Sequence, residues 1–173
     1  LLAPLLAGEN IGLMSDAGCP AVADPGAQLV QLAHKKGIKV VPMVGPSSIL
    51  LSLMASGLNG QQFAFLGYLP VEKLQRNQKL KEIEKRSASH KETQLFIETP
   101  YRNQAMMDAI WATGPLDVLL NNAAGNFLAR TERLSTRAFD AVVDIVLKGS
   151  AYCTMDVGRR WIEAGRKGTV MQI

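Results

Sequence analysis

Apolar blocks alternate with polar, glycine-rich and proline-rich blocks along the whole chain. Short apolar runs that end in turn residues predict buried strands, and longer stretches with apolar residues three and four positions apart predict helices. The expected elements of the first part are strands at residues 11–14, 38–44, 61–69 and 95–97 and helices at residues 27–36, 49–56, 72–92 and 104–111. This alternation predicts an α/β fold, a Rossmann-like layered arrangement with a largely parallel sheet.

The pattern changes character after Gly114 and Pro115, which mark a break in the chain. The expected elements beyond it are a strand at residues 118–120, a long helix over residues 135–162 and a final strand at residues 168–173. Gly149 and Gly158 lie inside this helix, and each costs about 1 kcal/mol relative to alanine. Close packing or a kink is therefore expected at these two glycines.

The composition fits a globular chain without metal or disulfide chemistry. At 173 residues and 47% hydrophobic content, the chain can form one ordinary domain or two small ones. Cys19 and Cys153 show no paired spacing, so no metal site and no disulfide framework are expected, and a cytoplasmic location is the default. No apolar stretch reaches the roughly 18 residues of a membrane-spanning helix, so no membrane contact is expected. The net charge of +4 permits an anionic ligand without requiring one.

The loop after the first expected strand is built from small residues, and it runs from Ser15 to Gly26. Small residues let a nucleoside-like cofactor approach the backbone, and Asp16 or Asp24 can accept hydrogen bonds from its hydroxyl groups. Taken alone, a proline- and glycine-containing loop after a strand is more often only a connection.

Six motifs in a fixed order give more specific evidence for a cofactor-binding role of this loop. They are Ser-Asp-Ala-Gly-Cys-Pro at residues 15–20, Asp-Pro-Gly at 24–26, Pro-Met-Val-Gly-Pro-Ser-Ser at 42–48, Ala-Ser-Gly at 55–57, Phe-Leu-Gly-Tyr-Leu-Pro at 65–70 and Glu-Thr-Pro-Tyr-Arg at 98–102. Through them, residues from about 5 to 110 resemble the S-adenosylmethionine-dependent tetrapyrrole methylase superfamily, near its ribosomal-RNA ribose methylase branch.

The resemblance implies a pocket for the methyl donor between a cofactor subdomain at residues 1–60 and a second subdomain that starts with residues 61–110. The cofactor-binding residues implied are Ser15, Asp16, Ala17, Gly18, Cys19, Pro20, Asp24, Ser47 and Ser48. In that family an early strand and a glycine-bearing loop precede the matching segment, and the second subdomain continues beyond it. We therefore expect S-adenosylmethionine binding with little or no turnover, since methyl transfer depends on precise alignment of donor and acceptor.

No catalytic residue or methyl acceptor is assigned by the sequence. RNA contact through the charged helix at residues 72–92 rests on the resemblance alone, because acidic and basic residues are interleaved there as on an ordinary solvated surface.

Residues from about 111 to 173 resemble a different family, the short-chain dehydrogenases, near the dienoyl-CoA-reductase-like branch. The match is carried by the run from Gly114 to Phe127, with Asn-Asn-Ala-Ala-Gly at residues 121–125. In that family this turn braces the central sheet beside a nicotinamide cofactor. However, Tyr152 is followed four residues later by Asp156 instead of lysine, so it cannot stand in for the Tyr-x-x-x-Lys pair of that family. No glycine-rich phosphate loop lies upstream either. NAD(P) binding is therefore not expected.

Two resemblances that meet near residues 110–115 without a linker suggest a chimera, because natural fusions usually join whole domains. Three functions remain open. The first is a methylase-derived protein that binds S-adenosylmethionine, the second is a recombined or engineered α/β chimera with one sheet and no ligand, and the third is a nicotinamide-binding dehydrogenase fragment. Sheet edges left exposed in such a chain favour self-association, so a homodimer is an expected state.

Overall fold

The computed structural model describes residues 2–15, 18–43, 45–123 and 129–172. The chain divides into two compact units, Leu1–Leu51 and Ser52–Ile173, which we call unit 1 and unit 2. The segments expected to form separate subdomains at residues 61–110 and 111–173 both lie in unit 2. The change of sequence character near Gly114 thus falls inside one compact unit.

Unit 1 contains helices but little regular structure besides. Its helices are α1 (Ala3–Leu6), α2 (Ala27–Lys35) and the first residues of α3 (Ser48–Ser56), which continues into unit 2. The expected helix from residue 27 is confirmed as α2, which ends just before Gly37, a residue in the left-handed region at φ 67°. The ends of α2 and α3 therefore lie within one residue of the expected bounds, 27–36 and 49–56.

The two strands expected in unit 1 are not formed. Residues 11–14 and 38–43 are without strand pairing in the described part of the unit, and Val44 lies outside the described residues. A strand needs a neighbour to satisfy its backbone N–H and C=O groups, and no described segment supplies one here. Their apolar side chains remain in solvent, as the exposed fractions of Met14 (91%), Val41 (65%) and Met43 (89%) show.

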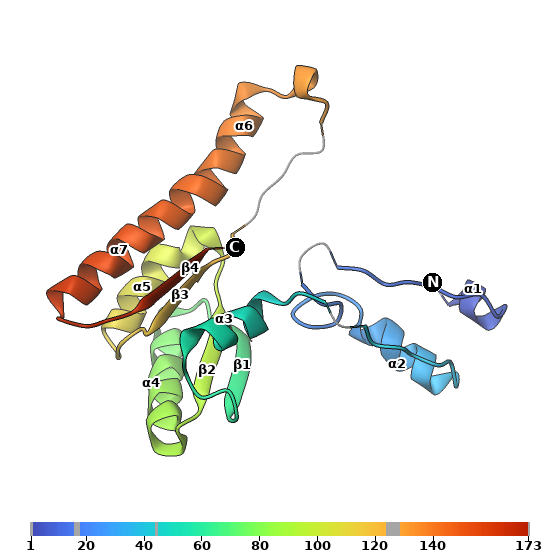
Figure 1. The fold of residues 1–173 in the computed structure, drawn as a ribbon, viewed down its shortest axis with the longest axis horizontal. Coiled ribbons are helices and arrows are strands. Elements are labelled where there is room, and N and C mark those ends of the chain that lie inside the picture. The colour runs from blue at the N-terminus through green and yellow to red at the C-terminus, as the bar shows by residue number, and fades with distance from the viewer. Residues whose placement is uncertain (1, 16–17, 44, 124–128, 173) are drawn as a thin grey trace. The chain divides into compact units, whose positions relative to one another are not determined.

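The first sheet of unit 2 joins β1 (Phe63–Tyr68) and β2 (Thr93–Ile97) in parallel (Figure 1). The connection between them is α4 (Lys73–His90), whose start is capped by Glu72 as its side chain accepts a 2.8 Å hydrogen bond from the Gln75 N–H. Phe65 lies opposite Leu95, and the register shifts before Tyr68 pairs with Ile97. A parallel pair joined by a helix is the connection that the sequence pattern predicts.

The second sheet joins β3 (Val118–Asn121) and β4 (Thr169–Gln172), again in parallel. The parallel pairing and the α/β class are therefore confirmed, but the described strands form two separate two-stranded sheets instead of one. The helices between β3 and β4 are η2 (Thr131–Arg133), α6 (Thr136–Val143), the π-helical turn η3 (Asp144–Lys148) and α7 (Gly149–Glu163).

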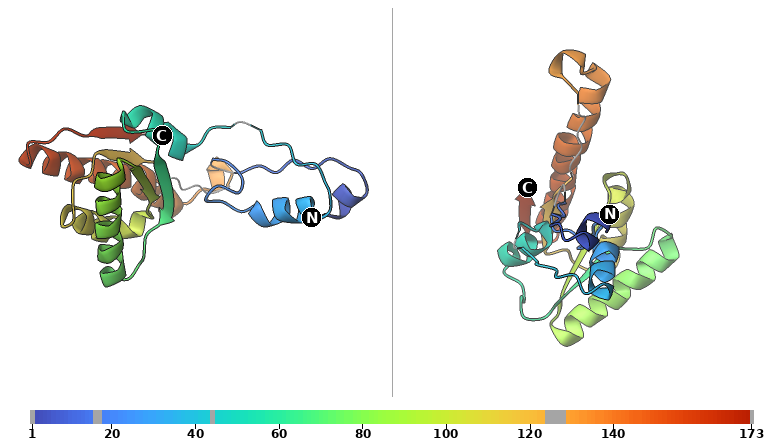
Figure 2. Two further views of the ribbon diagram at one scale, coloured as in Figure 1. Left: turned by 90° about the horizontal axis from the view of Figure 1, so that it is seen from below. Right: turned by 90° about the vertical axis from the view of Figure 1, so that its right-hand side faces the viewer.

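The last three of these helices follow one another as one rod, orange to red in Figure 2. The irregularity expected at Gly149 is present, since the π-helical turn ends immediately before it. At Gly158, where close packing or a kink is expected, a Cβ atom would meet nothing within 4 Å, so the close packing is not present. That glycine faces open space.

One hydrophobic core joins the two sequence parts of unit 2. It takes residues from α4, from α5 (Asn103–Trp111), which follows the short η1 (Pro100–Arg102), from β3 and from α7. Its buried members are Leu69, Leu80, Ile83, Met106, Met107, Ala109, Ile110, Leu119, Val157 and Trp161. The methylase-like helices and the dehydrogenase-like strand and helix therefore stabilise each other.

Polar contacts also cross between the two parts. The indole Nε1–H of Trp161 donates a 2.7 Å hydrogen bond to the carbonyl of Leu116. Arg160 on α7 donates to the carboxylate of Asp108 on α5 at 3.1 Å, and the Arg160 guanidinium lies 5.8 Å from the centre of the Trp111 ring. The interface between α5 and α7 thus combines apolar packing with paired charges.

We expect a small favourable coupling between Asp108 and Arg160. The Asp108 side chain is 58% exposed, so solvent screens the pair and its coupling should be about 0.5 kcal/mol. A double-mutant cycle with Asp108→Ala, Arg160→Ala and both together, followed by urea unfolding, measures this value. Additive effects of the two substitutions would mean that the ion pair does not link α5 to α7.

Candidate functional site

The small-residue loop lies in unit 1 and has an unusual backbone. Ser15 and residues 18–26 are described, whereas Asp16 and Ala17 lie outside the described residues. Ala21 and Ala23 adopt φ values of 66° and 55°, a conformation that costs free energy in residues with a side chain. Two backbone hydrogen bonds close the loop, from Val22 N–H to the Cys19 carbonyl at 3.1 Å and from Ala21 N–H to the Pro25 carbonyl at 3.2 Å. Strained loops of this kind often line functional sites.

Gly26 ends the loop and begins α2. Its φ of 137° is open to glycine but not to residues with a Cβ atom. A Cβ atom there would lie 2.9 Å from Leu13 Cδ2 and 3.2 Å from the Ala21 backbone nitrogen. The close return of the loop onto Ala21 therefore depends on glycine at this position.

Cys19 connects the loop to the turn at residues 45–48. Its thiol lies 3.9 Å from the Gly45 carbonyl oxygen and 3.7 Å from that of Pro46, within the range of weak S–H hydrogen bonds. Ser47 follows directly and is buried, and its carbonyl accepts the first helical hydrogen bond from Leu51 N–H. Two segments that the resemblance assigns to one side of a donor pocket are thus adjacent in the structure.

The other predicted site residues differ in exposure. Gly18 and Asp24 are exposed, and Ser15, Cys19, Pro20 and Ser48 are half-buried. A Cβ atom placed at Gly18 would meet nothing within 4 Å, and the Asp24 carboxylate is accessible as a hydrogen-bond acceptor.

The asparagine turn of the second resemblance lies in unit 2, and it is described only through Ala123. Ala124, Gly125 and Phe127 lie outside the described residues. Asn121, at the end of β3, is buried, and its side-chain Nδ2 donates a 2.9 Å hydrogen bond to Thr154 Oγ1 on α7. This contact fastens the strand to the helix, which is the bracing role expected for the motif.

A further polar cluster joins two of the methylase-like motifs, and the sequence reasoning did not single it out. Glu98 forms an ion pair with Arg102 and accepts a 2.7 Å hydrogen bond from the Thr99 backbone N–H. The Arg102 guanidinium lies 5.9 Å from the centre of the Tyr68 ring. The sequence contained a signal for this cluster, because the two motifs lie at the carboxyl ends of two expected strands. Parallel strands place these ends at the same edge of a sheet.

Metal binding and cysteine chemistry find no support in unit 2. Among the described residues, no group of three or more His, Cys, Asp or Glu side chains is placed to hold a metal ion. Burial raises the pKa of the Cys153 thiol, although the Asn103 amide donates to its sulfur at 3.2 Å. At neutral pH this thiol therefore stays protonated and is a weak nucleophile.

A search of the described residues for a helix long and apolar enough to cross a membrane finds none.

Curated proteins similar to this chain include methyltransferases. A ribosomal RNA small subunit methyltransferase I from Halalkalibacterium halodurans is 43% identical over 108 residues, which are 62% of this chain and 36% of that protein. The protein of the same name from Vibrio cholerae is 44% identical over 102 residues, 59% of this chain and 34% of that protein. The chain thus spans about a third of the length of these relatives, and the predicted resemblance to the methylase superfamily is confirmed.

Among solved structures, a short chain dehydrogenase from Bacillus anthracis is 29% identical and covers 64% of this chain and 44% of that chain, with a TM-score of 0.40.

The family model for the short chain dehydrogenase matches residues 39–173. This match begins well before residue 111, where the sequence reasoning places the start of the second resemblance, and it overlaps the methyltransferase match. The comparisons therefore do not place a junction at residues 110–115. Because the match covers most of its length, the chain belongs to the short chain dehydrogenase family.

Proposed function

We propose that unit 1 binds S-adenosylmethionine through the loop at residues 15–26 and the turn at residues 45–48. The observation that carries the proposal is the Cys19 thiol against the carbonyls of Gly45 and Pro46, which holds the two segments together. The methyltransferase relatives support it, since they confirm the methylase resemblance to which these two segments contribute motifs. Ser15, Asp16, Ala17, Gly18, Pro20, Asp24, Ser47 and Ser48 complete the proposed site.

The proposal concerns binding, with little or no methyl transfer. Alignment of donor and acceptor needs a rigid site, and among the described residues of unit 1 only Ala33 and Ser47 are buried. A unit with so small a core holds its loops loosely. RNA as the methyl acceptor is an extension of the proposal that rests on the names of the relatives.

Nicotinamide dinucleotide binding by unit 2 is the second candidate, and the family match over residues 39–173 favours it. Two features of the described residues weaken it. The Asn121 amide is buried against Thr154, and Asp156, four residues after Tyr152, is paired with Arg159 and Arg160. Tyr152 therefore cannot stand in for the tyrosine of a Tyr-x-x-x-Lys pair, because the residue four positions later is a carboxylate engaged with two arginines.

Isothermal titration of the purified chain with S-adenosylmethionine, and separately with NADH and NADPH, tests both candidates. We expect saturable heat with S-adenosylmethionine and none with either dinucleotide. Heat with a dinucleotide alone would replace the first candidate with the second. No heat with any of the three would contradict both and leave a scaffold without these ligands.

The Cys19→Ala variant tests whether the thiol contact organises the site. Loss of a weak hydrogen bond that holds the loop against the turn should raise the Kd for S-adenosylmethionine about twofold to fivefold. The matched control is Cys153→Ala, which removes the other cysteine from unit 2 and should leave the Kd unchanged. Equal affinities for the two variants would show that Cys19 does not position the loop.

A further inference from the structure

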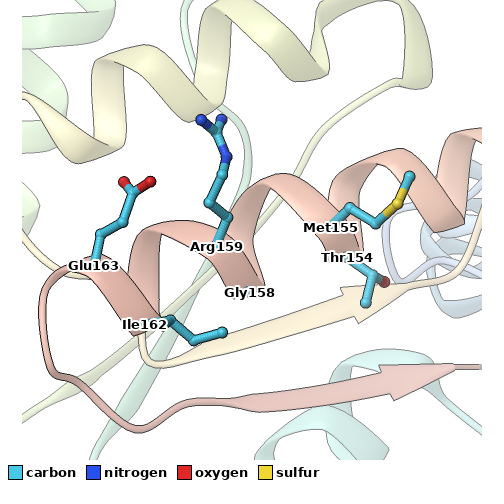
Figure 3. A pocket seen from close by; sticks show the side chains of 6 residues that line it. All are labelled: Thr154, Met155, Gly158, Arg159, Ile162 and Glu163. Atoms are coloured by element: carbon cyan, nitrogen blue, oxygen red, sulfur yellow. The ribbon is translucent and has the colours of Figure 1, made fainter.

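A shallow depression of about 530 Å³ lies on α7 and is lined by that helix alone, as Figure 3 shows. The Thr154 hydroxyl in its lining already accepts a hydrogen bond from the Asn121 amide. Arg159 is likewise bonded to a carboxylate of its own helix, that of Asp156. The depression therefore offers a small ligand one helix face and few free polar groups.

Asn59 lies in the segment before β1 and fastens it to the segment before β2. Its side-chain Nδ2 donates a 2.8 Å hydrogen bond to the carbonyl of Lys91, the left-handed residue that ends α4. Its own backbone carbonyl accepts a 2.9 Å hydrogen bond from Thr93 Oγ1. Because Phe63 and Thr93 pair in parallel at the start of the first sheet, these two contacts hold the beginnings of β1 and β2 side by side.

The same asparagine is followed by glycine, and Asn59–Gly60 is the only Asn-Gly pair in the sequence. The backbone nitrogen of the next residue can attack an asparagine amide, and a glycine there puts no side chain in the way. Both residues are exposed, and a Cβ atom placed at Gly60 meets nothing within 4 Å. Within the described part of the chain, the Gly60 N–H donates no hydrogen bond to another residue. The attacking nitrogen and the space around it are therefore open.

The Asn59 side chain is held in a position that favours this attack. Its Oδ1 accepts hydrogen bonds from the backbone N–H groups of Gln61 at 2.9 Å and of Gln62 at 3.3 Å. Attack on Cγ moves negative charge onto this oxygen, and two donors that already point at it stabilise that charge. We propose that Asn59 is converted spontaneously to aspartate and isoaspartate in the folded chain, through attack by the backbone nitrogen of Gly60.

The conversion needs only water and a solvent base. The Gly60 nitrogen gives its proton to the base and forms a bond to Cγ of Asn59. The bond between Cγ and Nδ2 then breaks, and the amide nitrogen takes a proton from solvent and leaves as ammonia. One water molecule opens the resulting five-membered succinimide at either of its two carbonyl groups. Opening at one carbonyl gives aspartate, and opening at the other gives isoaspartate.

Both products lose the hydrogen bond from Nδ2 to Lys91. A carboxylate has no hydrogen atom to donate, so its oxygen faces the Lys91 carbonyl without a bond between them. In isoaspartate the main chain also runs through the former side chain, which displaces the carbonyl that accepts from Thr93. The modification should therefore loosen the start of the first sheet and lower the urea concentration at which unit 2 unfolds.

Incubation of the full, folded chain at mildly alkaline pH, followed by peptide mapping with mass spectrometry, tests the proposal. We expect both products to accumulate at Asn59, and faster at higher pH because the attacking nitrogen must lose its proton. Asn10 is the comparison within the same molecule, since it is also exposed but is followed by Ile11. It should stay intact over the same period, because the larger side chain hinders attack.

Gly60→Ala is the matched variant. It should slow the conversion of Asn59 about tenfold or more, because its methyl group hinders the attacking nitrogen, while the open space at this position keeps the fold intact. Asn59→Asp shows the effect of the product on stability, and it should unfold at a lower urea concentration than Gly60→Ala.

Two results would overturn the proposal. The first is conversion of Asn59 only after the chain is unfolded in urea, which would mean that its hydrogen bonds protect the amide. The second is conversion in the folded chain that is no faster at Asn59 than at Asn10. An unchanged urea midpoint for Asn59→Asp would contradict the loosening of the first sheet.

Discussion

The Gly168→Ala variant is expected to lose about 3 kcal/mol of unfolding free energy, through overpacking of a tight contact. A Cβ atom at this position would overlap the indole ring of Trp161. The ring cannot easily move away, because it is buried in the core and its Nε1–H is held by the Leu116 carbonyl at 2.7 Å. Urea unfolding followed by tryptophan fluorescence measures the effect.

Gly60→Ala is the control for this experiment. Gly60 lies in the same unit, and a Cβ atom there meets nothing within 4 Å. Its substitution should change the unfolding free energy by no more than about 0.5 kcal/mol. If Gly168→Ala also stayed within that range, Trp161 would not pack against Gly168 as tightly as the structure shows.

The second large effect is expected from Gly26→Ala in unit 1. Alanine at φ 137° costs about 2 kcal/mol, and its Cβ atom would press on Leu13 and on the backbone of Ala21. The loop must then rearrange, which displaces Cys19 from the turn at residues 45–48. We expect the Kd for S-adenosylmethionine to rise about tenfold or more, as measured by isothermal titration.

Gly12→Ala is the matched control, because Gly12 lies in the same unit and a Cβ atom there meets nothing within 4 Å. It should bind S-adenosylmethionine as the unmodified chain does. An unchanged Kd for Gly26→Ala, with normal binding by the control, would show that the loop conformation does not contribute to the site.

The helices were predictable because their signals are local. The cap at Glu72 and the left-handed Lys91 (φ 53°) fix the ends of α4 through residues next to the helix. The start of α6 is set in the same way by Ser135, whose side chain accepts a hydrogen bond from the Ala138 N–H at 3.2 Å. The π-helical turn before Gly149 was expected only as an irregularity, since its position depends on packing along the whole rod.

The strands of unit 1 and the division into two sheets were not predictable from local pattern. The apolar runs around Met14 and Val41 read as buried strands, yet a strand forms only where a distant segment pairs with it. In unit 2 the same kind of run does form β1 and β2, because α4 returns the chain to pair them. The sequence pattern indicates that a run can form a strand, but it does not indicate whether a second strand is present to pair with it.

The candidate site was predictable in its residues but not in its contacts. Motif order identified the loop and the turn, and the structure adds the thiol of Cys19 as the group that joins them. The bracing role of Asn121 was expected, but its partner, Thr154, lies 33 positions away and has no signal in the motif. Side-chain pairs at such separations arise from the fold, so composition and spacing do not reveal them.

The core of unit 2 also constrains how this chain can change over generations. Met106 and Ile110 lie on α5, and Val157 and Trp161 lie on α7, yet all four belong to one cluster. A larger or smaller side chain at one of them alters the space left for the others. The effect of a core substitution on α5 therefore depends on the residues present on α7, and the reverse also holds. The two helices are thus expected to evolve together.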